Sequence, residues 1–246
     1  MRLVAALALV GLLVGCRGDT GEEERLVVSA AASLSDVFAA MEEVFEDANA
    51  GVDLILNFGG SSTMREQILE GAPVDVFASA NASTMAEVVR AGLTAAEPST
   101  FATNRLVIAV PAGNPAGVRS LNDFGKQRLL IGLCAESVPC GDLARETLDL
   151  AGVVPAVDST EPDVRALLVK IAEGELDAGI TYATDVAAAE DAVEGIEIAD
   201  DHNAVAEYRI AMLSGAANRE SASAFIEFVL SADGQGIMEQ FGFGSP

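Results

Sequence analysis

The chain has 246 residues, of which 50% are hydrophobic and 21% are charged. It is therefore long and apolar enough to bury a core, and it is not of the disordered class. The net charge of −24 argues against a nucleic-acid partner, which needs a basic surface, and gives no polybasic attraction to anionic lipid.

The N-terminal segment predicts export from the cytoplasm. Arg2 precedes an apolar run over residues 3–14, which is typical of a secretory signal peptide and too short for an ordinary membrane span. The run ends in LVGC, which resembles a bacterial lipobox. Residues 1–15 are thus expected to be a lipoprotein signal peptide, with Cys16 as the lipidated N-terminus. The alternative is an ordinary signal peptide that happens to contain a cysteine.

A polar tether is expected over residues 16–25, and the chain then alternates strand and helix patterns. Strands are predicted over residues 25–31, 52–58 and 74–80. Helices are predicted over residues 33–49, 63–71 and 83–92. Ser33 and Asp36 have the spacing of a helix capping box. This order predicts a parallel sheet with helices on its faces.

A second series of strands and helices begins near residue 103. Strands are predicted within residues 104–115, 128–134, 177–185 and 207–215. Helices are predicted over residues 120–124, 140–152, 161–174 and 219–243, with Pro162 at the first position of the third. We expect an α/β protein of two lobes, each a mixed, mainly parallel sheet flanked by helices. Lobe I is residues 26–103 plus 209–246, and lobe II is residues 104–208.

Two cysteines lie six residues apart in LCAESVPCGD, at Cys134 and Cys140. Disulfides persist outside the cytoplasm, and with Cys16 lipidated these two pair with no cysteine left over. Closing so short a loop stabilises the fold by roughly 2 kcal/mol. The alternatives are a free nucleophilic Cys140 at a helix start and a metal clip. The clip is disfavoured because the single histidine, His202, is distant in the chain.

Each predicted strand-to-helix junction carries glycine or small hydroxyl residues. The junctions read SAAASLS, FGGSST, VPCGD and TEPDV. Helix N-termini present unpaired N–H groups and the positive end of the helix dipole, so they suit an anion. Ligands of open α/β sheets bind at the carboxyl ends of the strands. Taken singly, however, Ser33 is explained by capping a helix and Tyr182 by packing.

Taken together, six motifs occur in the order and spacing of one protein family: AAASL, SST, GAPVDVFASA, VPCG, EPDVRALL and GITYATD. Over residues 26–243 the chain resembles the molybdate-binding proteins of bacterial ABC importers, which have a type II periplasmic binding fold. The resemblance implies that an oxyanion is held without a charged side chain, by Ser33, Ser61, Cys140, Val164 and Tyr182.

In that resemblance, Ser33 and Ser61 give a hydroxyl and a backbone N–H each, with Ser62 as the alternative register for Ser61. Cys140 and Val164 give backbone N–H groups, and Tyr182 gives its phenolic O–H. The family often has alanine where this chain has Cys140, which leaves the N–H donor in place.

The resemblance further implies a function in transport. We expect capture of molybdate and tungstate in the cleft between the lobes, with no cofactor and no direct metal ligand, and delivery to a permease driven by a cytoplasmic ATPase. The protein is expected to be extracytoplasmic, monomeric and held at the membrane by the lipid on Cys16. A site of donors alone suits a fully deprotonated dianion.

Other functions stay open as alternatives. A protonated anion such as hydrogen phosphate would want a carboxylate acceptor, but Asp36, Asp142 and Asp185 are expected to serve as helix N-terminal charges. Sulfate is a smaller alternative ligand. Ferric iron is disfavoured because Tyr182 and Tyr208 are the only tyrosines. A surface serine hydrolase lacks the G-x-S-x-G and S-x-x-K motifs, and we expect no enzyme. A structural lipoprotein would bind no small anion.

Overall fold

A computed structural model describes residues 24–246 of the chain. Cys16, the predicted signal peptide over residues 1–15 and most of the predicted tether lie outside the described residues. The first strand begins at Glu24, so the last two tether residues lie in a strand. Across residues 24–246, helices long and apolar enough to cross a membrane are absent.

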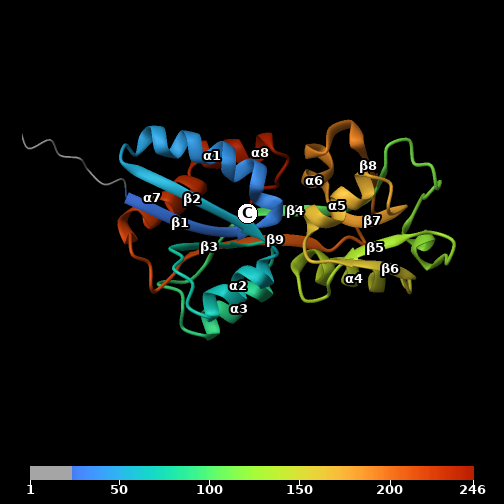
Figure 1. Ribbon diagram of the computed structural model, residues 1–246, viewed down its shortest axis with the longest axis horizontal. Coiled ribbons are helices and arrows are strands. Elements are labelled where there is room, and N and C mark those ends of the chain that lie inside the picture. Colours follow the sequence, from blue (N-terminus) through green and yellow to red (C-terminus); the bar gives the residue numbers. More distant parts are fainter. Residues whose placement is uncertain (1–23) are drawn as a thin grey trace, which may run out of the picture.

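Strands and short helices alternate along most of the described chain (Figure 1). The strands are β1 (Glu24–Ala31), β2 (Val52–Gly59), β3 (Val76–Ser79), β4 (Ser99–Pro111), β5 (Ile131–Cys134), β6 (Val157–Glu161), β7 (Ala178–Tyr182), β8 (Val193–Glu197) and β9 (Val205–Met212). The α-helices are α1 (Ser35–Ala48), α2 (Ser61–Leu69), α3 (Ala82–Arg90), α4 (Pro139–Leu150), α5 (Val164–Ala172), α6 (Ala183–Ala188), α7 (Arg219–Leu230) and α8 (Ala232–Gln240). Short 3-10 helices are η1 (Ala32–Leu34), η2 (Leu121–Gly125) and η3 (Glu190–Ala192).

The strands form one mixed sheet in the order β2-β1-β3-β9-β4-β7-β5-β6, with β8 paired to β4. β1 is parallel to β2 and β3, and β5 is parallel to β6 and β7. The strands β4 and β9 run antiparallel to their neighbours and join these two parallel groups. The mixed α/β architecture confirms the predicted fold class.

Two lobes are visible in Figure 1, one on each side of the central strands. We call the part with β1–β3, α1–α3, α7 and α8 lobe I, and the part with β5–β8 and α4–α6 lobe II. β4 pairs with β9 through residues 99–105 and with β7 and β8 through residues 106–111. The lobe boundaries predicted near residues 103 and 208 therefore fall inside the two connecting strands.

Three features of the fold differ from the sequence prediction. The sequence did not predict strands β6 and β8, because they are short and partly exposed, with the sequences VDSTE and VEGIE. The predicted C-terminal helix is two helices, separated at Ser231, whose hydroxyl caps the second. Helix α5 begins at Val164 and not at Pro162, because the Asp163 side chain caps it by accepting from the Ala166 N–H at 2.9 Å.

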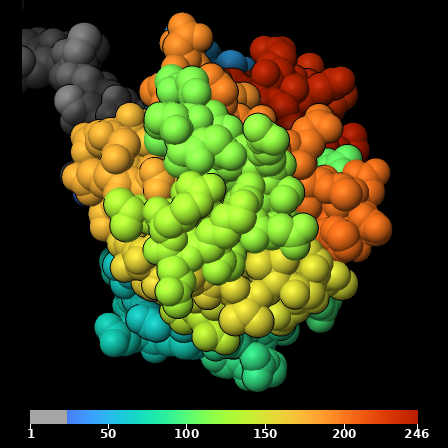
Figure 2. Space-filling view, turned by 90° about the vertical axis from the view of Figure 1, so that its right-hand side faces the viewer, coloured from blue at the N-terminus to red at the C-terminus, as the bar shows by residue number. Residues whose placement is uncertain are grey.

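The core runs through both lobes. Helix α1 buries Val37, Phe38, Met41 and Phe45, which share one face at helical spacing. An aromatic series leads from Phe38 through Phe101 to Tyr208 and Tyr182, with ring centroids 6.0 Å apart at each step. The packing therefore ties the middle of the sheet to the core of lobe I. Figure 2 shows the outer end of lobe II, where the segment coloured green to yellow forms most of the surface.

Candidate functional site

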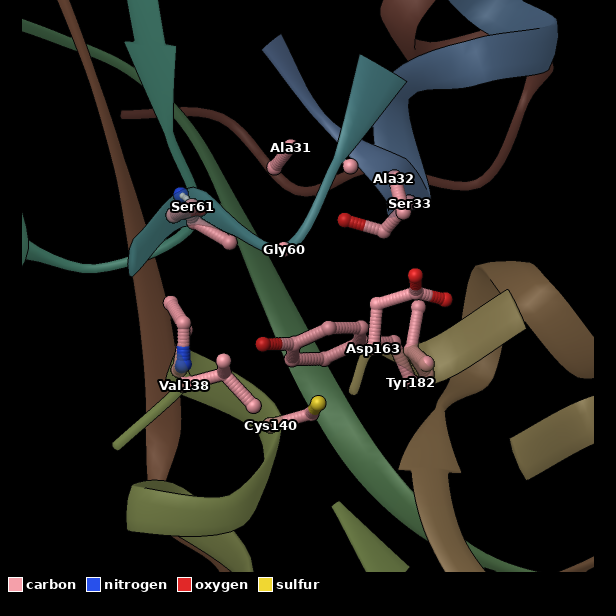
Figure 3. A pocket seen from close by; sticks show the side chains of 13 residues that line it. Ala31, Ala32, Ser33, Gly60, Ser61, Val138, Cys140, Asp163 and Tyr182 are labelled. Atoms are coloured by element: carbon pink, nitrogen blue, oxygen red, sulfur yellow. Dashed lines mark hydrogen bonds between the residues drawn. The ribbon is translucent and has the colours of Figure 1, made fainter. Parts of the chain in front are cut away.

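A small cavity of about 10 Å³ lies between the lobes, at the carboxyl ends of the parallel strands (Figure 3). The structure places all five predicted site residues on its wall, namely Ser33, Ser61, Cys140, Val164 and Tyr182. These residues follow or end β1, β2, β5, β6 and β7. The topology explains the convergence, because parallel strands of each lobe end at the same edge of the sheet.

Ser61 is the first residue of α2, and Gly60 is its N-cap. The Ser61 side chain is buried, and its Oγ accepts a hydrogen bond from the Ala80 N–H at 3.1 Å. The hydroxyl proton is therefore left to donate into the cavity. Ser62 does not line the cavity, and its hydroxyl instead donates to the Ser137 carbonyl of lobe II.

Ser33 lies in the 3-10 turn η1 and points into the cavity. The predicted capping box with Asp36 is wrong, because α1 has Leu34 at its N-cap and no side chain caps it. The Ser33 Oγ lies 2.8 Å from the Tyr208 hydroxyl, and the Asn104 side-chain amide donates to Tyr208 at 3.5 Å. With Tyr208 donating in turn, Ser33 keeps its own proton for the cavity.

Cys140 and Val164 stand in the first turns of α4 and α5, where backbone N–H groups have no acceptor within the helix. Cys140 forms a disulfide with Cys134, with the two Cα atoms 5.8 Å apart. This bridge joins the end of β5 to the start of α4 and holds the Cys140 amide against the cavity.

The loop that carries Cys140 has two further supports that the sequence did not reveal. A Cβ added to Gly141 would lie 1.9 Å from the Ala135 carbonyl oxygen, so only glycine fits. The Arg145 guanidinium donates to the Cys134 and Gly141 carbonyls at 3.1 and 3.0 Å. Glycine and arginine here fix the path of the backbone beside the predicted anion-binding amide.

Tyr182 ends β7, and its hydroxyl points into the cavity (Figure 3). The side chain is buried, yet its hydroxyl has no hydrogen-bond partner among the described residues. Burial, and then the nearby Tyr208, Asp185 and Asp142, raise the pKa of this phenol well above its usual value. The group therefore stays protonated and can act as a donor. A buried polar group without a partner is costly, so this hydroxyl indicates where a ligand atom would lie.

The wall includes one carboxylate, Asp163, that sequence reasoning missed. One of its oxygens is occupied in capping α5. The lining residues in the described chain include no lysine or arginine. The groups of the wall that can attract an anion are therefore helix N-termini and hydroxyl protons.

The lobes touch around the cavity. A Cβ added to Gly60 of lobe I would lie 2.7 Å from the Pro162 carbonyl oxygen and 3.3 Å from the Val138 side chain, both in lobe II. The Ser62–Ser137 hydrogen bond also crosses between the lobes. The structure thus has its lobes closed on each other, and glycine at position 60 permits this approach.

The family model described as bacterial extracellular solute-binding protein matches residues 26–244 of the chain. The chain belongs to this family. The molybdate-binding protein ModA of Mycobacterium tuberculosis (strain ATCC 25618 / H37Rv) is 36% identical over 253 residues, which cover 99% of this chain and 97% of that protein.

Two solved structures show the same fold. The periplasmic molybdate-binding protein of Azotobacter vinelandii has a TM-score of 0.80 at 18% identity, covering 90% of this chain and 99% of that chain. The sulfate-binding protein SubI of M. tuberculosis H37Rv has a TM-score of 0.79 at 17% identity, covering 89% and 86%. These likenesses concern the fold alone, and they confirm the predicted type II periplasmic binding architecture.

The arrangement of groups at the wall agrees with the family's description as solute-binding proteins. The wall presents hydroxyl and amide donors but no histidine, and His202 lies in the loop before β9, away from the cavity. Groups of three or more His, Cys, Asp or Glu side chains able to hold a metal ion are absent from residues 24–246. The relatives matched by the chain are likewise binding proteins.

Proposed function

We propose that this protein is the binding component of an ABC importer and that it captures molybdate, and tungstate with it, in the cavity between its lobes. In this proposal Ser33 and Ser61 donate from lobe I, and the Cys140 amide, the Val164 amide and the Tyr182 hydroxyl donate from lobe II. The name of the mycobacterial relative, which is 36% identical over nearly the whole chain, supports molybdate as the ligand.

The observation that carries the proposal is the buried Tyr182 hydroxyl, which has no partner within residues 24–246 and points into a cavity walled by other donors. A tetrahedral dianion accepts from several directions at once and needs no donor of its own. Each hydrogen bond to a charged partner contributes roughly 1.5–3 kcal/mol, so a handful of them would offset the cost of desolvating the anion.

The wall also favours a dianion over a protonated anion. A hydrogen phosphate ion would need an acceptor for its proton, and Asp163 is the only carboxylate among the described lining residues. Its Oδ1 already accepts from the Ala166 N–H. An ionised carboxylate at the wall repels either anion, and a dianion more strongly, so the donors must hold the anion through short local contacts.

Transport follows from the same proposal. The closed, loaded protein would present itself to a membrane permease driven by a cytoplasmic ATPase, as a monomer held at the membrane through lipid on Cys16. Local donors outweigh the chain's acidity because salt screens exposed charges beyond about 8–10 Å. We therefore expect anion affinity to depend only modestly on ionic strength.

Calorimetric titration of the protein with molybdate, tungstate, sulfate and phosphate tests the proposal. We expect tight one-to-one binding of molybdate and tungstate and weak or no binding of the other two. Binding of sulfate or phosphate in preference would reassign the ligand to another tetrahedral oxyanion. Failure to bind any of the four would overturn the proposal.

A further inference from the structure

Three charged residues meet beside the cavity, and each follows a residue of its wall closely in sequence. Asp36 comes three residues after Ser33, Arg165 directly after Val164, and Asp185 three residues after Tyr182. The three side chains therefore bring together the segments η1–α1, α5 and β7–α6. Asp36 belongs to lobe I, and Arg165 and Asp185 belong to lobe II.

Arg165 contacts both carboxylates. Its Nη2 donates to Oδ2 of Asp36, across the boundary between the lobes. Its Nε lies 3.2 Å from Oδ1 of Asp185, which is fully buried. One edge of the guanidinium thus lies beside Asp185 within lobe II, where neither the Arg165 Nε nor the Asp185 oxygens have a hydrogen-bond partner among the described residues. The other edge reaches out to lobe I.

The two contacts differ in energy. The Asp36 and Arg165 side chains are 44% and 30% exposed, and a partly exposed pair of this kind contributes only about 0.2–1 kcal/mol. The contact with Asp185 is of another kind, because Asp185 is fully buried and the two groups come within ion-pair distance without a hydrogen bond. Arg165 therefore lies beside Asp185 within lobe II and can bind Asp36 of lobe I only when the lobes close.

We infer that Arg165 is a positioning residue for anion capture, which clasps the closed lobes together through Asp36, with its guanidinium packed beside Asp185. This inference rests on the proposed function. Arg165 does not line the cavity, so it acts without touching the anion. A contact made only in the closed form lowers the free energy of that form, and anion affinity rises with the closed population.

The test compares Arg165→Gln, Asp36→Asn and the double variant with the unchanged protein. Molybdate affinity is measured by calorimetry, and the opening of the lobes by the radius of gyration from small-angle X-ray scattering. Arg25→Gln is the matched control, because Arg25 pairs with Asp53 at 3.8 Å entirely within lobe I. Arg165→Lys retains the charge and tests rescue.

We expect Asp36→Asn to weaken molybdate binding about two- to fivefold, the range of a partly exposed pair. Arg165→Gln should weaken it by at least the same factor, because it removes the contact to Asp36 and also the neighbour of the buried Asp185. The double variant should bind no worse than Arg165→Gln alone, and Arg165→Lys should recover part of the affinity. The radius of gyration of the ligand-free protein should increase for Arg165→Gln and stay unchanged for Arg25→Gln.

Unchanged affinity together with unchanged scattering for Arg165→Gln would overturn the clasp. Additive losses in the double variant would overturn the pairing of Asp36 with Arg165. If the unchanged protein binds no anion, the proposed function fails, and the scattering of ligand-free proteins still decides the clasp. Should Arg165→Gln not fold, Asp36→Asn carries the test, since Asp36 lies at the surface and its replacement leaves Asp185 paired.

Discussion

The two lobes bring different kinds of donor to the cavity. Lobe I offers the Ser33 and Ser61 hydroxyls, which already contact Tyr208 and the Ala80 N–H. Lobe II offers backbone amides at two helix starts and the Tyr182 hydroxyl, which has no partner among the described residues. One wall is thus hydrogen-bonded within the fold, and the other keeps a hydroxyl that the proposed anion would satisfy.

This difference separates two roles that a binding residue can have. A hydroxyl that accepts from the fold and donates to the ligand contributes to stability and to binding together. A hydroxyl with no partner in the fold contributes to binding and costs stability. Lobe II also holds the fully buried Asp185. We therefore expect the stability that lobe II contributes to depend more strongly on pH than the stability that lobe I contributes.

The largest expected effect concerns Asp185 and pH. Burial raises the pKa of the Asp185 carboxyl to about 7, and the charges of Asp36 and Asp163 add to the increase, while Arg165 opposes it. The folded state then binds a proton that the unfolded state has lost between about pH 4 and pH 7. Stability contributed by this group is therefore present at low pH and falls as pH rises through 7.

Replacing Asp185 with Asn should remove that dependence. The free energy of unfolding of Asp185→Asn, relative to the unchanged protein, should increase from pH 4.5 to pH 8 by on the order of 3 kcal/mol, since each pKa unit corresponds to about 1.4 kcal/mol. Urea unfolding at several pH values measures it. Asp149→Asn, at an exposed position late in α4, is the control and should show no such trend. A constant difference across pH would contradict the prediction.

The second prediction concerns a donor on the lobe I wall. Ser61→Ala removes a donor to the anion and leaves the buried Ala80 N–H without its acceptor. We expect molybdate binding to weaken by roughly 1.5–3 kcal/mol and unfolding to require about 1–3 kcal/mol less free energy. Calorimetry and urea unfolding measure the two quantities.

Ser62→Ala serves as the control for register, since Ser62 donates to the Ser137 carbonyl and lies off the cavity wall. Its loss should weaken binding less than the loss of Ser61. If Ser62→Ala gave the larger loss of affinity, the assignment of Ser61 as the donor would be wrong.

The sequence predicted the α/β order and the segments that surround the cavity, because strand ends, glycines and small hydroxyls mark them locally. It did not predict contacts between segments far apart in the chain. Ser33 meets Tyr208 across 175 positions, and Arg165 meets Asp36 across 129. The sequence did not predict Asp163 at the wall, because a proline is favoured at the start of a helix and the pattern places that start at Pro162. In the structure Asp163 is the N-cap of α5. The roles of the five site residues stay predictions until binding is measured.

The third prediction concerns a donor on the lobe II wall. Its removal should affect stability in the opposite direction to Ser61→Ala. Tyr182→Phe keeps the ring that packs on Tyr208 and removes only the hydroxyl without a partner. We expect molybdate affinity to drop by about 2 kcal/mol, or roughly thirtyfold. Stability without ligand should stay equal or increase, because no buried group is left unsatisfied. Loss of both affinity and stability would show that the hydroxyl is bonded within the fold.

The smallest expected effect on affinity concerns the disulfide that supports the Cys140 amide. Replacing Cys134 and Cys140 together with Ala should lower the free energy of unfolding by no more than about 2 kcal/mol, as expected for a short loop. The backbone N–H of residue 140 survives the change, and the Arg145 contacts to the same loop remain. Molybdate affinity should therefore weaken only about two- to fivefold, through a loss of preorganisation.

The two readouts distinguish the functions of the bridge. Lower stability with weaker binding would show that the disulfide positions an anion-binding amide. Lower stability with unchanged affinity would make it a support for the fold alone, with Gly141 and Arg145 sufficient to place the amide. In that case lobe II would resemble lobe I more closely than the unpartnered Tyr182 hydroxyl suggests, because its backbone donors would be fixed by ordinary hydrogen bonds within the fold.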